Sequence, residues 1–230
     1  MIYITGDTHA NVDRIEEFCR KMQTSKEDIM IILGDAGFNY FCNLADYDLK
    51  EKAQSLPVTF FCIHGNHEER PQNLSCYHET EFHGGTVFQQ KDFPDLYFAK
   101  DGEFYDFGGK TCLALGGAYS VDKNYRLCYG FPWYASEQPD NAEKARILER
   151  ISAHGWHTDY VFSHTCPYDT RPVHLFLSGL DQSKVDTSME EWLQEISDRL
   201  EFQRWYFGHF HDDWTNGRYE MLFKQIKMLD

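Results

Sequence analysis

The chain has 230 residues, of which 42% are hydrophobic and 26% are charged. This is the balance of an ordinary globular protein, and the length is that of one large domain or two small ones. Lysine and arginine number 22 against 37 aspartates and glutamates, so the formal net charge is −15. A chain this acidic lacks the positive field of a nucleic-acid-binding protein, so nucleic acid is not expected as a partner.

The sequence contains no signal for a membrane or for export. No apolar run approaches the roughly 20 residues of a membrane-spanning helix, and no secretory signal is visible. The seven cysteines are odd in number, and no two lie within four residues of each other. This spacing indicates reduced thiols, several of them in the core, rather than a disulfide framework or a zinc knuckle. We therefore expect a cytoplasmic protein that does not engage a membrane.

The first part of the chain alternates strand and helix patterns. All-apolar runs at 2–5, 29–33 and 58–63 are typical of strands buried on both faces. Apolar residues at helical spacing predict helices over 12–22 and 44–56, the second one ending before a proline. This alternation predicts a parallel sheet covered by helices.

The middle of the chain, residues 84–120, holds short β-rich runs separated by glycine pairs. These runs predict a second sheet with hairpins, whose strands are 87–89, 97–99, 103–107 and 111–115. Helices over 142–153 and 189–200 and strands at 160–163 and 204–207 are expected to follow, with a closing hairpin within 217–227. Because neither a linker nor an internal repeat interrupts these patterns, we expect a single domain over residues 1–230.

Each short buried strand of the parallel part ends in a polar group of residues, usually after a glycine. The side chains so placed are of the metal-ligating type, namely Asp7, His9, Asp35, Asn66, His164, His209 and His211. Loops at the carboxyl ends of parallel strands are where α/β folds place their sites. Any one of these residues alone is more often a turn, cap or core residue, but five strand ends with the same chemistry favour a joint site.

This oxygen-and-nitrogen set contains no thiolate, and it exceeds the capacity of one cation. It suits two divalent ions of the manganese, iron or zinc kind. A carboxylate could bridge such a pair, which activates water and clamps the oxygens of a phosphoryl group.

The order and approximate spacing of these motifs resemble those of the calcineurin-like metallophosphoesterases. The matching motifs are Gly6-Asp7-x-His9, Gly34-Asp35, Gly65-Asn66-His67-Glu68, His164 and Gly208-His209-x-His211. They extend from residue 6 to residue 211, so the resemblance covers nearly the whole chain. It implies an α/β fold of two packed mixed β-sheets flanked by helices, in line with the two-part strand pattern.

The resemblance also implies roles for individual residues. One metal would be held by Asp7, His9 and His211, the other by Asn66, His164 and His209, with Asp35 bridging them. His67 would not bind metal but would stabilise the transition state or protonate the leaving oxygen. The nucleophile would be a metal-bound hydroxide, without a covalent phosphoenzyme. We expect manganese, although iron, zinc, cobalt and nickel accept the same ligands.

Two departures separate the chain from the protein serine/threonine phosphatases of this superfamily. The two arginines that grip phosphate in those enzymes are absent, and His64 stands where one of them would be. Phe38 occupies the place of the aspartate that would pair with the catalytic histidine. A protein substrate is therefore disfavoured, and a small phosphomonoester or phosphodiester is the expected substrate.

Substrate recognition is expected between the third and fourth motifs, in residues 68–159. Within this region Lys123 and Arg126 are candidate phosphate-binding residues, although a solvated loop explains them equally well. Arg70 and Arg171 also lie near motifs, and each is interpreted as a surface salt-bridge partner.

Two alternatives to a small-molecule phosphatase or phosphodiesterase remain open. A metal-dependent nuclease would use the same metals, but the net charge argues against it. A catalytically silent protein that binds metal or a partner would be expected to have lost ligands, whereas this chain retains all seven and His67. The sequence leaves the oligomeric state undetermined.

Overall fold

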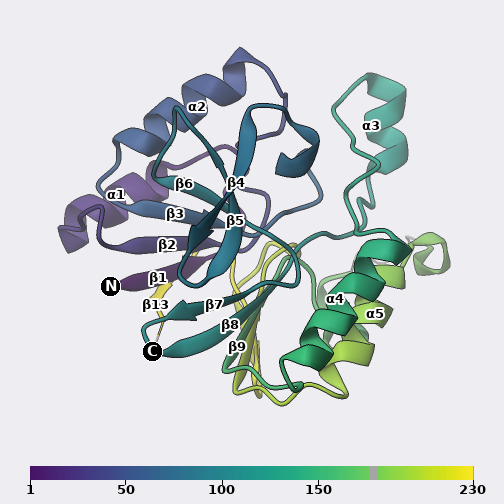
Figure 1. Ribbon diagram of the computed structural model, residues 1–230. Helices are drawn as coiled ribbons and strands as arrows, with labels where there is room; N and C mark the ends of the chain where they lie inside the picture. Colours follow the sequence, from purple (N-terminus) through teal and green to yellow (C-terminus); the bar gives the residue numbers. More distant parts are fainter. Residues whose placement is uncertain (177–180, 230) are drawn as a thin grey trace.

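The computed structural model describes residues 1–176 and 181–229. Two β-sheets pack face to face, and helices cover their outer faces (Figure 1). The α-helices of the described part are α1 (Asp13–Met22), α2 (Leu44–Ser55), α3 (Lys123–Tyr129), α4 (Asn141–Ala153) and α5 (Ser188–Ser197). This confirms the predicted α/β class with two mixed sheets flanked by helices. The range of the expected single domain includes residues 177–180 and 230, which lie outside the described residues.

The first sheet has seven strands in the order β13-β1-β2-β3-β6-β5-β4. Its central strands β1, β2, β3 and β6 are parallel, and the outer strands join antiparallel. The strands are β1 (Ile2–Thr5), β2 (Ile29–Ile32), β3 (Thr59–Cys62), β4 (Tyr77–Phe82), β5 (Gly85–Gln90), β6 (Leu96–Ala99) and β13 (Ile226–Met228).

The second sheet has six strands in the order β11-β12-β10-β9-β8-β7. Strands β8, β9, β10 and β12 are parallel, while β7 and β11 pair antiparallel at the two edges. The strands are β7 (Phe104–Phe107), β8 (Lys110–Leu115), β9 (Tyr160–Ser163), β10 (Arg204–Phe207), β11 (Trp214–Asn216) and β12 (Tyr219–Met221).

The layering explains why the central strands are apolar at every position. In β2, Met30 and Ile32 pack into the cluster that α1 shares, while Ile31 packs into the cluster between the sheets. In β8, Leu113 belongs to the cluster that α4 and α5 cover, and Ala114 to the one between the sheets. Both faces of each central strand are therefore buried, as for parallel sheets in general.

The structure corrects the predicted pairing of the middle strands. The region 84–120 does not form one separate sheet, because β5 and β6 extend the first sheet whereas β7 and β8 begin the second. The closing hairpin consists of β11 and β12 and ends at Met221. The chain then crosses to the first sheet, where β13 pairs with β1 and Ile226 packs against its core.

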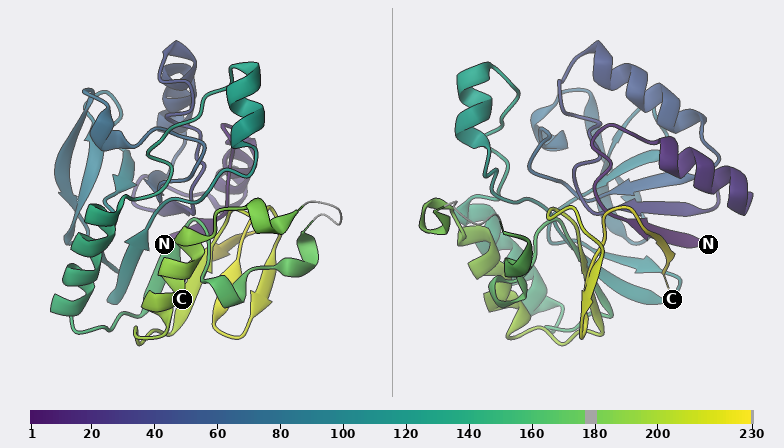
Figure 2. Two further views of the ribbon diagram at one scale, coloured as in Figure 1. Left: turned by 90° about the vertical axis from the view of Figure 1, so that its right-hand side faces the viewer. Right: turned by 180° about the vertical axis from the view of Figure 1, so that it is seen from behind.

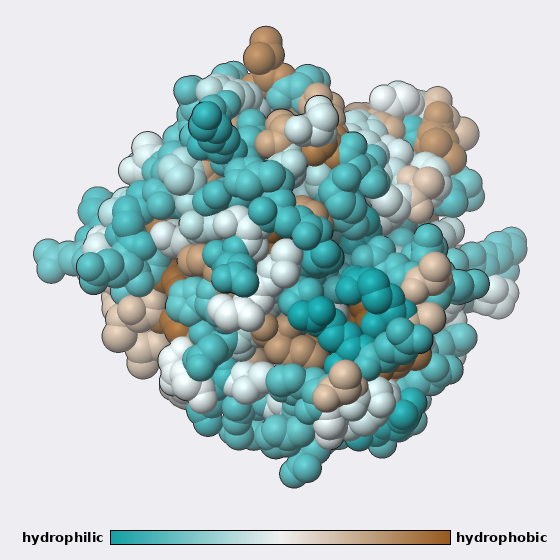
Figure 3. Space-filling view, viewed as in Figure 1, coloured by the Kyte–Doolittle hydropathy of each residue, from teal (hydrophilic) through white to brown (hydrophobic). Residues whose placement is uncertain are grey.

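Helix α3 was not expected from the sequence, and its ribbon projects from the body of the molecule (Figures 1 and 2). None of its residues is buried, and Tyr125, Leu127 and Tyr129 are exposed. Hydrophobic side chains gather where α3 lies in the space-filling view (Figure 3). This helix has only seven residues and no buried side chain, so it is too short to give a clear periodic signal in the sequence.

The thiols and the helix lengths agree with the expectations from the sequence. The described chain contains no disulfide, and Cys19, Cys62, Cys112 and Cys166 are buried. Within the residues described, none of the helices combines the length and apolarity needed to span a bilayer.

Candidate metal centre

The predicted ligands come from loops at the carboxyl ends of five parallel strands in both sheets. Asp7 follows β1, Asp35 follows β2, Asn66 follows β3, His164 follows β9 and His209 follows β10. The two sheets pack against each other, so these loops meet at one edge of the sandwich. The site lies where α/β folds usually bind ligands.

Two buried carboxylates occupy the middle of this site. Asp7 and Asp35 are each only 1% exposed. Asp7 Oδ1 accepts a hydrogen bond from the backbone N–H of His209 at 2.9 Å, and Asp35 Oδ1 accepts one from His67 N–H at 2.9 Å. The other oxygen of each carboxylate, Oδ2, is buried and has no hydrogen-bond partner among the described residues. Such orphaned anionic oxygens are costly unless a cation compensates them.

Histidine nitrogens surround these two orphaned oxygens. Asp7 Oδ2 lies 3.3 Å from His211 Nε2 and 3.6 Å from His9 Nε2. Asp35 Oδ2 lies 3.6 Å from His164 Nε2 and 3.9 Å from His9 Nδ1. Asp35 thus stands between histidines of both predicted metal sets, which is the position that a bridging carboxylate requires.

His164 and Asn66 face each other at hydrogen-bond distance. His164 Nδ1 donates to the backbone oxygen of Leu33 at 2.8 Å, and Asn66 Nδ2 donates to Ser120 Oγ at 2.9 Å. These bonds orient His164 Nε2 toward Asn66 Oδ1, 2.8 Å away. In the protonated ring Nε2 donates to this oxygen, and a cation bound by both atoms would take the place of that proton.

The spacing of the donor atoms fits divalent cations. The ligand atoms of Asp7, His9 and His211 lie within 4.8 Å of one another, as do those of Asp7, Asp35 and His164. Metal–ligand bonds of about 2.0–2.2 Å place two ligands of one ion roughly 3 Å apart. His209 joins neither of these two groups, and its ring lies 5.0 Å from that of His164.

The electrostatics of the site favour positive charge. Burial opposes the ionised form of Asp35, but His164, His67 and His9 together outweigh it and hold the pKa of this carboxyl well below its usual value. The pKa of Asp7 is also lowered, since His164, His211 and His9 together outweigh burial. Burial opposes the charged form of His164, yet Asp35 and Asp7 raise its pKa to about 9. Burial and the neighbouring His164 lower the pKa of His209 to about 3.

The backbone is strained at four of the seven predicted ligands. The φ angles are 45° at His9, 48° at Asp35, 70° at His209 and 56° at His211. Residues other than glycine rarely adopt this left-handed conformation, and such strain concentrates at functional sites. Gly34 also has a positive φ, and a Cβ there would overlap the His164 ring. The glycine before Asp35 therefore allows the close approach of the β9 loop.

The predicted catalytic residue, His67, lies at the rim of the carboxylate cluster. Its Nε2 is 3.9 Å from Asp35 Oδ2 and accepts from Asn66 Nδ2 at 3.3 Å and from Arg126 Nη2 at 3.4 Å. Its Nδ1 is buried without a hydrogen-bond partner in the described chain, so no backbone carbonyl orients the ring there. Burial lowers the pKa of His67, with Arg126 adding to this effect and Asp35 opposing it.

The two predicted phosphate-binding residues lie in different surroundings. Helix α3 brings Arg126 to His67, and the guanidinium is anchored by Asp122 Oδ2 at 2.8 Å and by Tyr40 Oη at 3.1 Å. The ammonium of Lys123 instead lies over the Trp133 ring, 4.0 Å from its centroid.

Two other arginines differ from their interpretation as surface salt-bridge partners. Arg70 is only 4% exposed and forms a buried ion pair with Asp101. Arg171 stacks on the Tyr168 ring at 3.4 Å and lines the cavity beside the site. Both positions depend on packing between distant segments, which their sequence neighbourhood does not encode.

A cavity of about 850 Å³ opens from the carboxylate cluster. One wall comes from Tyr119 to Asn124, within the predicted specificity region, and includes Asp122. The other wall comes from Arg171, Phe176 and described residues between 181 and 190, of which the sequence analysis named only Arg171. The residues that line both this cavity and the site are Asp35, Asn66, His67, His209 and His211.

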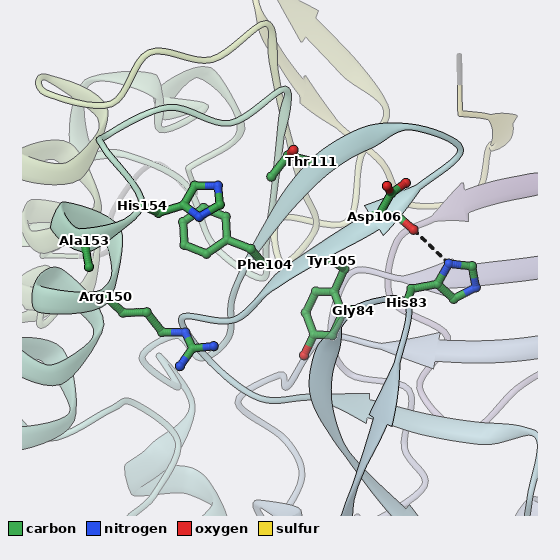
Figure 4. Close-up of a pocket in the computed structure, with 9 residues that line it drawn as sticks. All are labelled: His83, Gly84, Phe104, Tyr105, Asp106, Thr111, Arg150, Ala153 and His154. Carbon is green, nitrogen blue, oxygen red and sulfur yellow. Dashed lines mark hydrogen bonds between the residues drawn. The ribbon is translucent and has the colours of Figure 1, made fainter.

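A second depression, of about 520 Å³, lies at the amino-terminal end of β8 (Figure 4). Its polar groups are engaged locally, because His83 Nδ1 donates to the backbone oxygen of Asp106 at 2.8 Å and Arg150 pairs with Glu103. The His154 ring stacks on Phe104 with centroids 3.7 Å apart. The candidate metal-binding groups found among the described residues lie at the first cavity and not at this depression.

Comparison with protein families identifies this arrangement. The family model for calcineurin-like phosphoesterases matches residues 1–213. The chain belongs to the calcineurin-like phosphoesterases. Membership supports metal-dependent hydrolysis of phosphate esters as the general activity of this phosphoesterase, and the Asp/His groups described above are its candidate metal ligands.

Comparison with solved structures adds distant similarities. The chain is 12% identical to phosphopantetheinyl hydrolase (PptH) from Mycobacterium tuberculosis, covering 96% of this chain and 89% of that one with a TM-score of 0.46. It is 13% identical to the protein of unknown function AQ665 from Aquifex aeolicus, covering 74% and 81% with a TM-score of 0.35. The comparison with curated proteins finds no match.

Proposed function

We propose that the phosphoesterase holds two divalent cations, with manganese as the expected metal, and hydrolyses a small phosphomonoester or phosphodiester. The observation that carries this proposal is the pair of buried, unpartnered oxygens of Asp7 and Asp35, which face converging histidines. The proposed ligands are Asp7, His9 and His211 for one ion, Asn66, His164 and His209 for the other, and Asp35 for both.

When bound, the cations would supply an activated water and neutralise the charge of the phosphoryl group. The residues of the chain hold and orient the reacting groups. The hydrogen bond from His209 N–H to Asp7 Oδ1 and that from His67 N–H to Asp35 Oδ1 fix both carboxylates in place. Because these bonds exist before substrate arrives, the ligand cage is preorganised.

His67 is the proposed acid or transition-state stabiliser. It lines the cavity beside the carboxylates, where the leaving oxygen of a bound ester would lie. Burial lowers its pKa in the free protein, which favours the neutral ring. An incoming phosphate anion would favour the protonated ring, which can then donate its proton to the leaving oxygen.

Arg126 is the proposed phosphate-binding residue in this chain, which lacks the two arginines of the protein phosphatases. Its guanidinium stands 3.4 Å from His67 and is anchored by Asp122 and Tyr40. An anchored guanidinium offers paired donors that match phosphate oxygens.

The test of this proposal is a paired assay. The metal-free protein is reloaded with Mn²⁺ and assayed with p-nitrophenyl phosphate and bis-p-nitrophenyl phosphate. We expect turnover by the wild type, with the preferred ester distinguishing a phosphatase from a phosphodiesterase.

Asp35→Asn should abolish turnover because it replaces the carboxylate shared by both ions with a neutral amide, which is a weaker metal ligand. The exposed Asp92 provides the control Asp92→Asn, which should keep wild-type activity. If the protein binds metal but turns over neither ester, the proposed hydrolysis of these esters is contradicted. That result would support the alternative of a catalytically silent protein that binds metal or a partner.

His67→Ala should keep the metal content of the wild type but lower kcat. The expected loss is about 10²–10⁴-fold, the usual contribution of a positioned acid. Metal analysis beside steady-state kinetics checks both parts, with exposed His78→Ala as the matched control. Loss of metal together with activity would contradict the separation of His67 from the ligand set.

Arg126→Ala should lower kcat/KM by roughly 10- to 100-fold, mainly through KM, since a hydrogen bond to a charged group contributes about 1.5–3 kcal/mol. Lys123→Ala should have a smaller effect because its ammonium lies on Trp133. Arg20→Ala on the exposed face of α1 controls for the loss of a positive charge. Equal effects of the first two variants would overturn the assignment of phosphate binding to Arg126 over Lys123.

A further inference from the structure

A buried carboxylate outside the metal cluster lines the same cavity. Glu190, in the first turn of α5, is only 6% exposed. Its Oε1 accepts a hydrogen bond from Thr165 Oγ1 at 2.7 Å, and Thr165 directly follows the proposed ligand His164. Glu190 is therefore linked to the site although it takes no part in the proposed mechanism.

The second oxygen of Glu190 has no side-chain partner among the described residues. Thr165 is the only side chain in the described ranges that donates to Glu190, and no basic group there lies within ion-pair distance of it. Burial raises the pKa of Glu190, and the hydrogen bonds from Thr165 and from its own backbone N–H, with the charge of Arg171, oppose this rise only in part. A buried carboxylate with a free acceptor is stabilised when a donor reaches it.

The other carboxylates of the cavity wall outside the metal cluster are contacted by neighbouring groups of the chain. Lys184 and Ser183 contact Asp181, and the Ser188 N–H contacts Asp186. Arg126 pairs with Asp122 Oδ2, while Asp122 Oδ1 is buried without a hydrogen-bond partner in the described chain. Glu190 differs because it is both buried and open to the cavity.

An apolar surface lies beside Glu190 in this cavity. Phe176, Val185 and Phe210 line it, and the rings of Phe176 and Phe210 stack with centroids 6.2 Å apart. Phe210 stands between the proposed ligands His209 and His211 in the chain. The apolar surface therefore begins at the cluster itself, where the leaving group of an ester would extend.

We propose that Glu190 determines specificity, because its free oxygen accepts a hydrogen bond from a hydroxyl or amino group on the leaving group of the substrate. The apolar part of that leaving group lies against Phe176 and Phe210. The substrate is accordingly a phosphate ester whose leaving group combines an apolar face with a hydrogen-bond donor. This inference rests on the proposed phosphoester hydrolysis and names the substrate class of that site.

The test compares three esters in the wild type and in Glu190→Gln. p-Nitrophenyl phosphate has no donor on its leaving group, whereas 4-aminophenyl phosphate and adenosine 5′-monophosphate carry donors at different distances from phosphorus. In Glu190→Gln the amide oxygen can still accept from Thr165, while the amide N–H faces the cavity. A donor on the leaving group would then meet another donor instead of an acceptor. We expect kcat/KM to fall about 10-fold or more, through KM, on at least one donor-bearing ester, and to change less than about twofold on p-nitrophenyl phosphate.

Two further variants keep this test decisive. Glu195→Gln, exposed on the same helix, should leave all three esters unaffected. Glu190→Ala removes the acceptor altogether, and its Tm, measured beside kinetics, reveals any loss of folding. Both Glu190 variants should show the same substrate dependence.

The outcomes separate this inference from the function on which it rests. An equal loss on all three esters would assign Glu190 a structural role between Thr165 and α5, and would overturn the inference. No loss on the donor-bearing esters, or no wild-type turnover of them beside turnover of p-nitrophenyl phosphate, would overturn it as well. Absence of wild-type turnover on these three monoesters and on bis-p-nitrophenyl phosphate would instead overturn the proposed function.

Discussion

The site depends on two buried carboxylates that each bind a backbone N–H with one oxygen and leave the other free. Asp7 connects the loop after β1 to the loop after β10, so it joins the two sheets. Asp35 connects the loops after β2 and β3 of the first sheet. Because the free oxygens are buried, they are stable only beside positive charge, and the surrounding histidines and strained loops are arranged around that requirement.

Much of the site could be predicted because its residues follow strands that are recognisable locally. Asp7, Asp35 and Asn66 come directly after apolar runs, and parallel strands bring their carboxyl ends to one edge. The pairing of the middle strands could not be predicted, since packing, not the local pattern, decides that β5 joins the first sheet and β7 the second. The short hydrophobic runs therefore predict where the strands lie in the sequence but not which strands pair in a sheet.

The residues proposed to recognise the substrate are even harder to predict from the sequence than the strand pairing. Arg126 reaches His67 because an exposed helix, held to Tyr40 by a hydrogen bond, projects over the site. Glu190 enters the cavity because α5 packs against the loop after β9. Neither position carries a motif, and each depends on contacts between segments far apart in sequence. The cavity thus combines the predicted region 68–159 with a second wall after residue 170.

The central claim is that two cations share the Asp7 and Asp35 cluster and that both are needed for hydrolysis. The most direct measurement titrates Mn²⁺ into the metal-free protein while binding and turnover of the preferred ester are followed together. The account predicts two ions per chain, with turnover appearing as the second site fills. Binding of one ion or none per chain, or full turnover with the second site empty, would contradict it.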